Sequence, residues 1–258
     1  MAVAATEPRE ALASATGTAV DDLRLGIVGA GKFGTTLARA AVAAGYDVAI
    51  SGSRTPDHIA LTVEVLAPGA TAATTEEVVR RADVIVLAVP THRFRELPPD
   101  LFAGKILIDA MNYWEPVDGD DPELAAAADG TSKVVQDHFR AARVVKSLNQ
   151  LGYHQLEDNQ RPKGAPDRIA IGAAGDDRLA VAKVKRLLDR LGFDPVDAGP
   201  LKNGLTLEPD GSPIAITYSA AASGQGFPQV AGTQRSSSCS TWRRGAVIAL
   251  PFAHRPRK

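Results

Sequence analysis

The feature that most constrains the fold is a set of three glycines at the spacing G-x-G-x-x-G, directly after the short apolar segment LRLGIV. The first glycine of such a motif allows a tight turn, the second lets a cofactor pyrophosphate approach the backbone, and the third lets helix and strand pack closely. The sequence after Gly34 predicts a helix, whose free N–H groups would hold the pyrophosphate. The predicted cofactor contacts in this loop are Gly29, Ala30, Gly31, Lys32, Phe33 and Gly34.

The next predicted strand, YDVAIS, ends where NAD-binding proteins carry an acidic residue. An Asp or Glu there binds the ribose hydroxyls of NAD and repels a 2′-phosphate. This chain has Ser51, Gly52, Ser53 and Arg54 instead, and His58 follows one helical turn later. Hydroxyls and a guanidinium suit a phosphate, because Arg forms charge-assisted and often bidentate bonds to it. The sequence therefore predicts NADP(H), and the alternative is that Arg54 is only a solvated loop arginine.

Apolar runs alternate with helical stretches along most of the chain. The later runs are rich in Val and Ile, which is typical of strands buried on both faces. They are DVIVLAVP (83–90), KILIDAMN (105–112), RVVKSLN (143–149) and DRIAIGA (167–173). Helices are indicated by Pro56 at a helix start, by a capping box from Thr74 to Glu77, and by residues 176–192. This alternation predicts the α/β class, with a doubly wound, mostly parallel sheet of the Rossmann NAD(P)-binding type in a single domain.

In an open α/β sheet, ligands sit outside the carboxyl ends of the strands, at the point where the strand order reverses. The run 83–90 leads into a loop at such an end, and we expect the nicotinamide to lie over it. The residues predicted to contact this end of the cofactor are Ala88, Val89 and Pro90, together with Asn112 from the loop after the next strand.

Three polar side chains near that end are the candidates for catalysis: His92, Asn112 and Asn149. Both asparagines follow strands and could bind the carboxamide or a second substrate, although each could also merely form a turn. For His92, a solvated or capping role is favoured over acid–base catalysis. The sequence offers no evident acid, which disfavours carbonyl reduction, whereas hydride transfer between two redox cofactors needs mainly proximity and orientation.

The two ends of the chain differ from the predicted domain of residues 23–208. Residues 1–22 lack apolar periodicity and are expected to be a disordered lead-in. Residues 209–258 read as a basic, atypical and poorly ordered tail, since the stretch after Asp210 holds six basic residues and no acid. A nucleic-acid-binding arm is one interpretation of this tail, and a foreign C-terminus is the favoured one.

Composition narrows the class further. The longest apolar runs are too short to span a bilayer, and the first residues lack the pattern of a secretory signal. The single cysteine, Cys239, argues against disulfides and multi-cysteine metal sites. We expect a cytoplasmic protein with no metal, no membrane contact and no nucleic-acid partner. Its partners would be small-molecule redox cofactors.

Five segments, in order, resemble the deazaflavin-dependent NADP oxidoreductases, also called NADPH:coenzyme F-420 reductases. They are GIVGAGKFGTTLARAAVAAGYDVAISGSR, ADVIVLAVP, GKILIDAMN, RVVKSLNQLG and FDPVDAGPL. The resemblance spans roughly Leu23 to Glu208, and the oxidoreductase domain of the STEAP metalloreductases is also similar. It implies a homodimeric Rossmann enzyme in which Ser53 and Arg54 hold the 2′-phosphate. It also implies that Ala198 to Leu201 border a second cofactor, coenzyme F-420 or a flavin.

Two other functions are compatible with the same motifs. One is an NADP-dependent imine or hydroxyacid reductase, although no helical C-terminal domain is evident in the sequence after Leu201. The other is a non-catalytic NADPH sensor or regulatory protein, which would also carry an intact glycine motif without an assignable acid or base.

Overall fold

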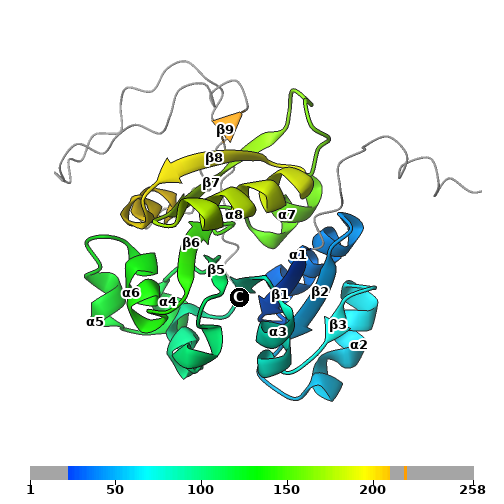
Figure 1. Ribbon diagram of the computed structural model, residues 1–258, viewed down its shortest axis with the longest axis horizontal. Coiled ribbons are helices and arrows are strands. Elements are labelled where there is room, and N and C mark those ends of the chain that lie inside the picture. Colours follow the sequence, from blue (N-terminus) through cyan, green and yellow to red (C-terminus); the bar gives the residue numbers. More distant parts are fainter. Residues whose placement is uncertain (1–22, 210–217, 220–258) are drawn as a thin grey trace, which may run out of the picture.

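The computed structural model describes residues 23–209 and 218–219, which form one sheet with helices on both faces (Figure 1). The predicted lead-in 1–22 and nearly all of the predicted tail 209–258 lie outside the described residues. The strands are β1 (Arg24–Val28), β2 (Asp47–Ser51), β3 (Thr71–Ala72), β4 (Val84–Leu87), β5 (Ile106–Asp109), β6 (Arg143–Ser147), β7 (Ile169–Gly175), β8 (Asp194–Gly199) and β9 (Tyr218–Ser219).

The helical elements connect these strands. The α-helices are α1 (Lys32–Ala43), α2 (Pro56–Leu66), α3 (Thr75–Arg81), α4 (Glu115–Asp118), α5 (Pro122–Ala125), α6 (Thr131–His138), α7 (Tyr153–Asp158) and α8 (Arg178–Arg190). The 3-10 helices are η1 (Thr91–Glu96), η2 (Pro99–Phe102) and η3 (Leu201–Leu207). In Figure 1 the blue and cyan elements β1–β3 and α1–α3 gather on one side, and the green helices α4–α6 on the other.

The sheet order is β3-β2-β1-β4-β5-β6-β7-β8, and β9 pairs with β7. All pairs from β3 to β6 are parallel, so the order reverses between β1 and β4, as in a doubly wound fold. The predicted α/β Rossmann class with a mostly parallel sheet is therefore confirmed. In-register pairing also brings the carboxyl ends of β1, β2, β4, β5 and β6 to one edge of the sheet.

Strand β7 is the exception to this regularity, because it runs antiparallel to β6. The connection between these strands contains only the short helix α7, and the chain turns back instead of crossing over to continue the parallel order. Strand β8 then pairs parallel to β7 after the crossover helix α8. The apolar run of β7 looks like the others in sequence because both of its faces are buried, whatever its direction.

Two apolar layers bury the faces of the sheet. One includes Ile27 and Val86 with residues of α1 and α8, and the other includes Ile85 and Leu87 with residues of α3 and α6. Neighbouring residues of a strand thus point into opposite layers, which explains the continuous apolar runs.

Local signals in the sequence set the helix starts. Pro56 is the first residue of α2, as predicted. The predicted capping box at α3 is confirmed: Glu77 N donates to Thr74 Oγ1 at 3.2 Å, and Thr74 N donates to Glu77 Oε2 at 3.0 Å. Asp177 caps α8 by accepting a bond from Ala180 N. Among residues 23–209 and 218–219, no helix is long and apolar enough to cross a membrane, and no acidic, His and Cys side chains cluster as metal ligands would.

Candidate functional site

The glycine loop lies between β1 and α1 and is shaped by close backbone contacts. A Cβ on Gly29 would lie 2.2 Å from the carbonyl oxygen of Ala88, and the φ of Gly29 is +125°. A Cβ on Gly34 would lie 1.8 Å from the carbonyl oxygen of Gly29. Both positions therefore exclude any side chain, and the tight turn and the close helix–strand packing follow from that exclusion.

Gly31 differs from the other two glycines of the motif. A Cβ there would meet nothing within 4 Å, so its side faces open space at the N-terminus of α1. No side chain caps this helix, and its first turn contains no acidic residue. An uncapped helix N-terminus with free N–H groups and open space in front of it fits a pyrophosphate. Lys32 and Phe33 form the first turn, beside that space.

The loop after β2 lies directly beside the glycine loop, because Gly29 N donates to Ser51 O at 2.8 Å. Ser51 itself is buried, and its hydroxyl accepts a bond from Thr75 Oγ1 at 3.1 Å, which leaves it facing α3. Ser53 and Arg54 are exposed, and within the part of the chain that the structure describes Arg54 has no ion-pair partner. Of the predicted phosphate ligands, Ser53 and Arg54 are thus accessible and Ser51 is not.

The remaining predicted phosphate ligand, His58, lies in the first turn of α2. It is exposed, and its Nδ1 is 3.0 Å from Thr55 Oγ1, the hydroxyl of the residue that precedes the helix. The loop from Ser53 to His58 is therefore polar and open, with no carboxylate before Asp57.

The loop after β4 contacts the glycine loop at Ala88, whose carbonyl group lies against the backbone of Gly29. Val89 is half-buried and Pro90 exposed. Because the strand order reverses between β1 and β4, these residues flank the crevice where the middle of a dinucleotide would lie. The predicted contacts at Ala88, Val89 and Pro90 lie at the required place, and they stay predictions.

The two candidate asparagines lie together. Asn112 Nδ2 donates to Asn149 O at 2.8 Å, and Asn149 Nδ2 donates to Asn112 Oδ1 at 3.0 Å and to Leu207 O at 2.7 Å. The Oδ1 of Asn149 is buried and, among the described residues, accepts no bond. Leu148 before it has a φ of +66°, a strained value for a leucine. The asparagines therefore join the loops after β5 and β6 and leave one buried acceptor unpaired.

A buried ion pair beneath these loops was missed by the sequence analysis. Lys146 is 0% exposed and Asp109 is 1% exposed, and Lys146 Nζ donates to Asp109 Oδ2 at 3.3 Å and to Met111 O at 2.6 Å. Asp109 also accepts bonds from Met111 N and Ser132 Oγ. This network fixes the backbone just before Asn112. The sequence did contain a signal for this pair: a lysine lies inside the apolar run RVVKS, and an aspartate lies inside ILIDA, the preceding strand.

The third catalytic candidate, His92, does have a carboxylate partner. Its Nδ1 lies 3.0 Å from Asp118 Oδ1, a residue of α4 that is 26 positions further along the chain. This separation hid the pair from the sequence analysis. Arg95 of η1 binds Asp121 and Glu123 at 2.6 Å each, which also joins η1 to the start of α5.

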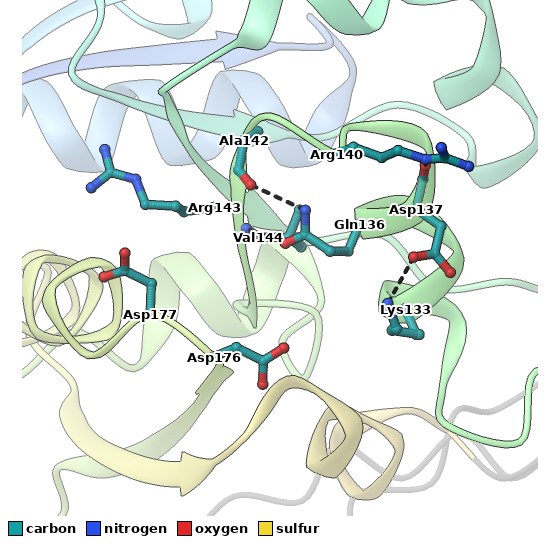
Figure 2. Close-up of a pocket in the computed structure, with 9 residues that line it drawn as sticks. All are labelled: Lys133, Gln136, Asp137, Arg140, Ala142, Arg143, Val144, Asp176 and Asp177. Carbon is teal, nitrogen blue, oxygen red and sulfur yellow. Dashed lines mark hydrogen bonds and ion pairs between the residues drawn. The ribbon is translucent and has the colours of Figure 1, made fainter.

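Two features lie away from this edge. The first is the segment 198–201, in which Ala198 and Leu201 are buried. Leu201 N donates to Asp176 Oδ1, and Asp176 lies beside the start of β6, at the opposite edge of the sheet. The structure thus does not bring residues 198–201 to the loops around Pro90 and Asn112. Leu207 at the end of η3 reaches them instead. An open hollow of about 520 Å³ also lies at the start of β6, lined by charged side chains from α6 and the β7–α8 turn (Figure 2).

Comparison with known proteins agrees with this arrangement. Residues 24–113, which hold the glycine loop, the loop after β2 and the loop after β4, match the family described as NADP oxidoreductase, coenzyme F420-dependent. Over 187 residues the chain is 30% identical to the metalloreductase STEAP3 of Rattus norvegicus. That alignment covers 72% of this chain and 36% of STEAP3, so the chain spans about a third of the length of STEAP3.

Two solved structures are similar over most of their length. One is the protein SMa0349 of Sinorhizobium meliloti, with a TM-score of 0.66 and 26% identity over 76% of this chain and 94% of that one. The other is described as a proposed F420-dependent NADP reductase from Arthrobacter sp. FB24. It has a TM-score of 0.60 and 27% identity over 71% of this chain and 88% of that one.

Proposed function

We propose that this chain belongs to the coenzyme F420-dependent NADP oxidoreductase family, whose model its residues 24–113 match, and that it transfers a hydride between NADP(H) and a deazaflavin such as coenzyme F-420, or a flavin-type acceptor. The observation that carries the proposal is the exposed Ser53–Arg54 pair beside the glycine loop. It occupies the place where an acidic residue would select NAD.

Recognition of NADP(H) would be divided between backbone and side chains. The N-terminus of α1 and the open side of Gly31 would hold the pyrophosphate, and Arg54 with Ser53 would hold the 2′-phosphate. When bound, NADPH supplies the hydride. The loop from Ala88 to Pro90 would position the nicotinamide at the edge where the β4 and β5 strands end.

The residues around that edge would orient a second planar substrate. Hydrogen bonds of the Asn112–Asn149 pair join the loops after β5 and β6 to the end of η3. The buried Lys146–Asp109 ion pair fixes the backbone of the loop after β5. Such rigid support suits a hydride transfer, whose rate depends strongly on the distance and orientation of the two rings.

Assembly and cellular location are further parts of the proposal. The family resemblance supports a homodimer, and the single cysteine supports a reducing, cytoplasmic setting. Light scattering during size-exclusion chromatography measures the mass directly; a mass of 27.0 kDa over a range of concentrations would reject the dimer.

The activity is tested by mixing the protein with NADPH and, separately, with coenzyme F-420, FMN and a ferric chelate, while acceptor reduction is followed optically. We expect reduction of coenzyme F-420 or FMN, and a much lower rate with NADH. Reduction of the ferric chelate alone would reject the deazaflavin and flavin assignment.

The same assay separates the other two functions. Tight NADPH binding, measured by fluorescence, without reduction of any acceptor would favour an NADPH sensor. Oxidation of NADPH by cyclic imines or hydroxyacid precursors, without reduction of coenzyme F-420 or FMN, would favour the imine or hydroxyacid reductase.

A further inference from the structure

The histidine of η1 and the aspartate of α4 form an oriented pair on the loop that follows Pro90. Asp118 Oδ1 accepts bonds from His92 Nδ1 at 3.0 Å and His92 N at 3.2 Å, and Asp118 Oδ2 accepts a bond from Trp114 N at 2.9 Å. The carboxylate of Asp118 is 3% exposed, whereas the side chain of His92 is 40% exposed. A buried, fully bonded carboxylate thus holds a histidine whose other side is open to solvent.

This arrangement determines which nitrogen of His92 can react. A carboxylate that accepts a bond from Nδ1 keeps a proton on that nitrogen, as in other Asp–His pairs. Within residues 23–209, the Nε2 atom has no hydrogen-bond partner. Nε2 is therefore the atom that can give a proton to, or take one from, a molecule that lies beside the loop.

The segment that Asp118 anchors carries two exposed apolar side chains. Trp114 and Val117 are 57% and 58% exposed, and both belong to the segment that Asp118 anchors. This segment begins two residues after Asn112. Exposed aromatic surface on a segment that is bonded to the partner of an oriented histidine suits a planar ring that is apolar on its face and polar at its edge.

We propose that His92 is the proton donor to the acceptor ring, with Asp118 as its positioning residue and Trp114 as part of the surface on which the ring lies. This inference rests on the proposed function. It assigns the role of the acid to His92, for which the sequence favoured a solvated or capping role, and it explains why the chain buries a carboxylate outside the cofactor loops.

The step balances as one hydride and one proton. The C4–H bond of NADPH breaks and its electron pair forms a C–H bond on the deazaflavin, or an N–H bond at N5 of a flavin, so NADPH is oxidised and the acceptor reduced. The charge that gathers on the N1–C2=O edge of the acceptor is neutralised when the Nε2–H bond of His92 breaks and an N1–H bond forms. Water then reprotonates His92.

Charged and titratable groups lie on the elements around His92. Asp118 contacts it from α4, and on η1 Glu96 lies near it while holding Arg93 in an ion pair. Arg95 points its charge at Asp121 and Glu123, and His138 of α6 lies at the far end of η1, bonded to Leu97 O. The nearest charge to the imidazole is thus the carboxylate of Asp118.

The test compares His92→Gln and Asp118→Asn with the matched control His154→Gln, an exposed histidine on α7 away from the pair. With saturating NADPH and the acceptor that the wild type reduces, we expect His92→Gln to lower kcat about 100-fold and to remove the fall in kcat towards alkaline pH. NADPH affinity and Tm should not change. Asp118→Asn should lower kcat and leave the KM for NADPH unchanged, because the amide no longer fixes the orientation and the tautomer of the imidazole.

A readout without turnover uses NMR of the histidine side chains. Addition of the oxidised acceptor should shift the His92 signals of the wild type, and addition of NADP⁺ alone should not. A wild type that reduces no acceptor overturns the proposed function and this inference together. Normal turnover with an unchanged pH profile in His92→Gln overturns this inference alone.

Discussion

The two halves of the sheet edge are built in different ways. On the cofactor side, the glycine loop and the loop after β2 are shaped by backbone contacts and by the absence of side chains at Gly29 and Gly34. On the proposed acceptor side, side chains bond residues that are 26, 37 and 58 positions apart: His92 with Asp118, Asp109 with Lys146, and Asn149 with the backbone of Leu207. The first kind of site depends on a local motif, and the second depends on the whole fold.

The largest expected effect tests the side-chain half. Lys146→Met leaves the buried Asp109 without its counter-charge, and we expect the free energy of unfolding to fall by about 3–5 kcal/mol in urea titrations. Lys133→Met is the matched control, since its ion pair with Asp137 is exposed and should contribute less than about 1 kcal/mol. Equal losses of unfolding free energy in Lys146→Met and Lys133→Met would show that the buried ion pair does not stabilise the proposed acceptor side more than an exposed pair stabilises the surface.

The backbone half is tested by two alanine substitutions in one motif. Gly34→Ala drives a methyl group into the carbonyl of Gly29, and we expect a loss of about 3 kcal/mol in stability together with the loss of NADPH binding. Gly31→Ala meets only open space, so Tm should stay within about 1 °C while NADPH binding weakens roughly tenfold. If Gly31→Ala bound NADPH normally, the open side of Gly31 would not be the pyrophosphate site.

The side chain that sets cofactor choice comes next. Arg54→Ala removes one charge-assisted contact, and we expect NADPH to bind roughly 10- to 100-fold more weakly, corresponding to about 1.5–3 kcal/mol, with little change for NADH. Isothermal titration with both cofactors measures the difference. Equal weakening for both would mean that Arg54 does not contact the 2′-phosphate.

A smaller effect is expected where only a local cap is removed. Thr74→Ala deletes the hydroxyl that accepts the bond from Glu77 N at the start of α3, and stability should fall by about 1 kcal/mol without a change in NADPH affinity. Thr74→Ser keeps the hydroxyl and serves as the control. A change in NADPH affinity in Thr74→Ala would indicate that α3 reaches the cofactor site through Ser51.

The smallest expected effect is a pH dependence from the same cap. Hydrogen bonds from the backbone N–H and the hydroxyl of Thr74 lower the pKa of Glu77 below its usual range. A lowered pKa gives stability that is present above the ordinary glutamate pKa of about 4.3 and is lost as the pH falls through the folded value. Thermal melts between pH 3 and 6 should therefore show a weaker acid dependence in Glu77→Gln than in the wild type.

Particular residues show how far the sequence alone could lead. The glycine spacing, Pro56 and the Thr74–Glu77 box predicted loops and helix starts correctly, because each acts through residues within one turn of the chain. Ser51 was expected to face the cofactor, yet Thr75 draws its hydroxyl into the interior. The direction of β7 was equally hidden, since burial on both faces produces the same apolar run in parallel and antiparallel strands.

The sequence by itself determined the Rossmann fold and the preference for NADP(H) that we propose, since glycine sterics and the chemistry of one loop after β2 are local properties. Only the tertiary structure decided which polar residues meet at the acceptor side. His92 and Asp118 become a pair because α4 folds back onto η1, and Lys146 becomes buried because β6 pairs with β5 at Asp109. Contacts of this kind depend on the closure of long loops, and no local spacing in the chain encodes them.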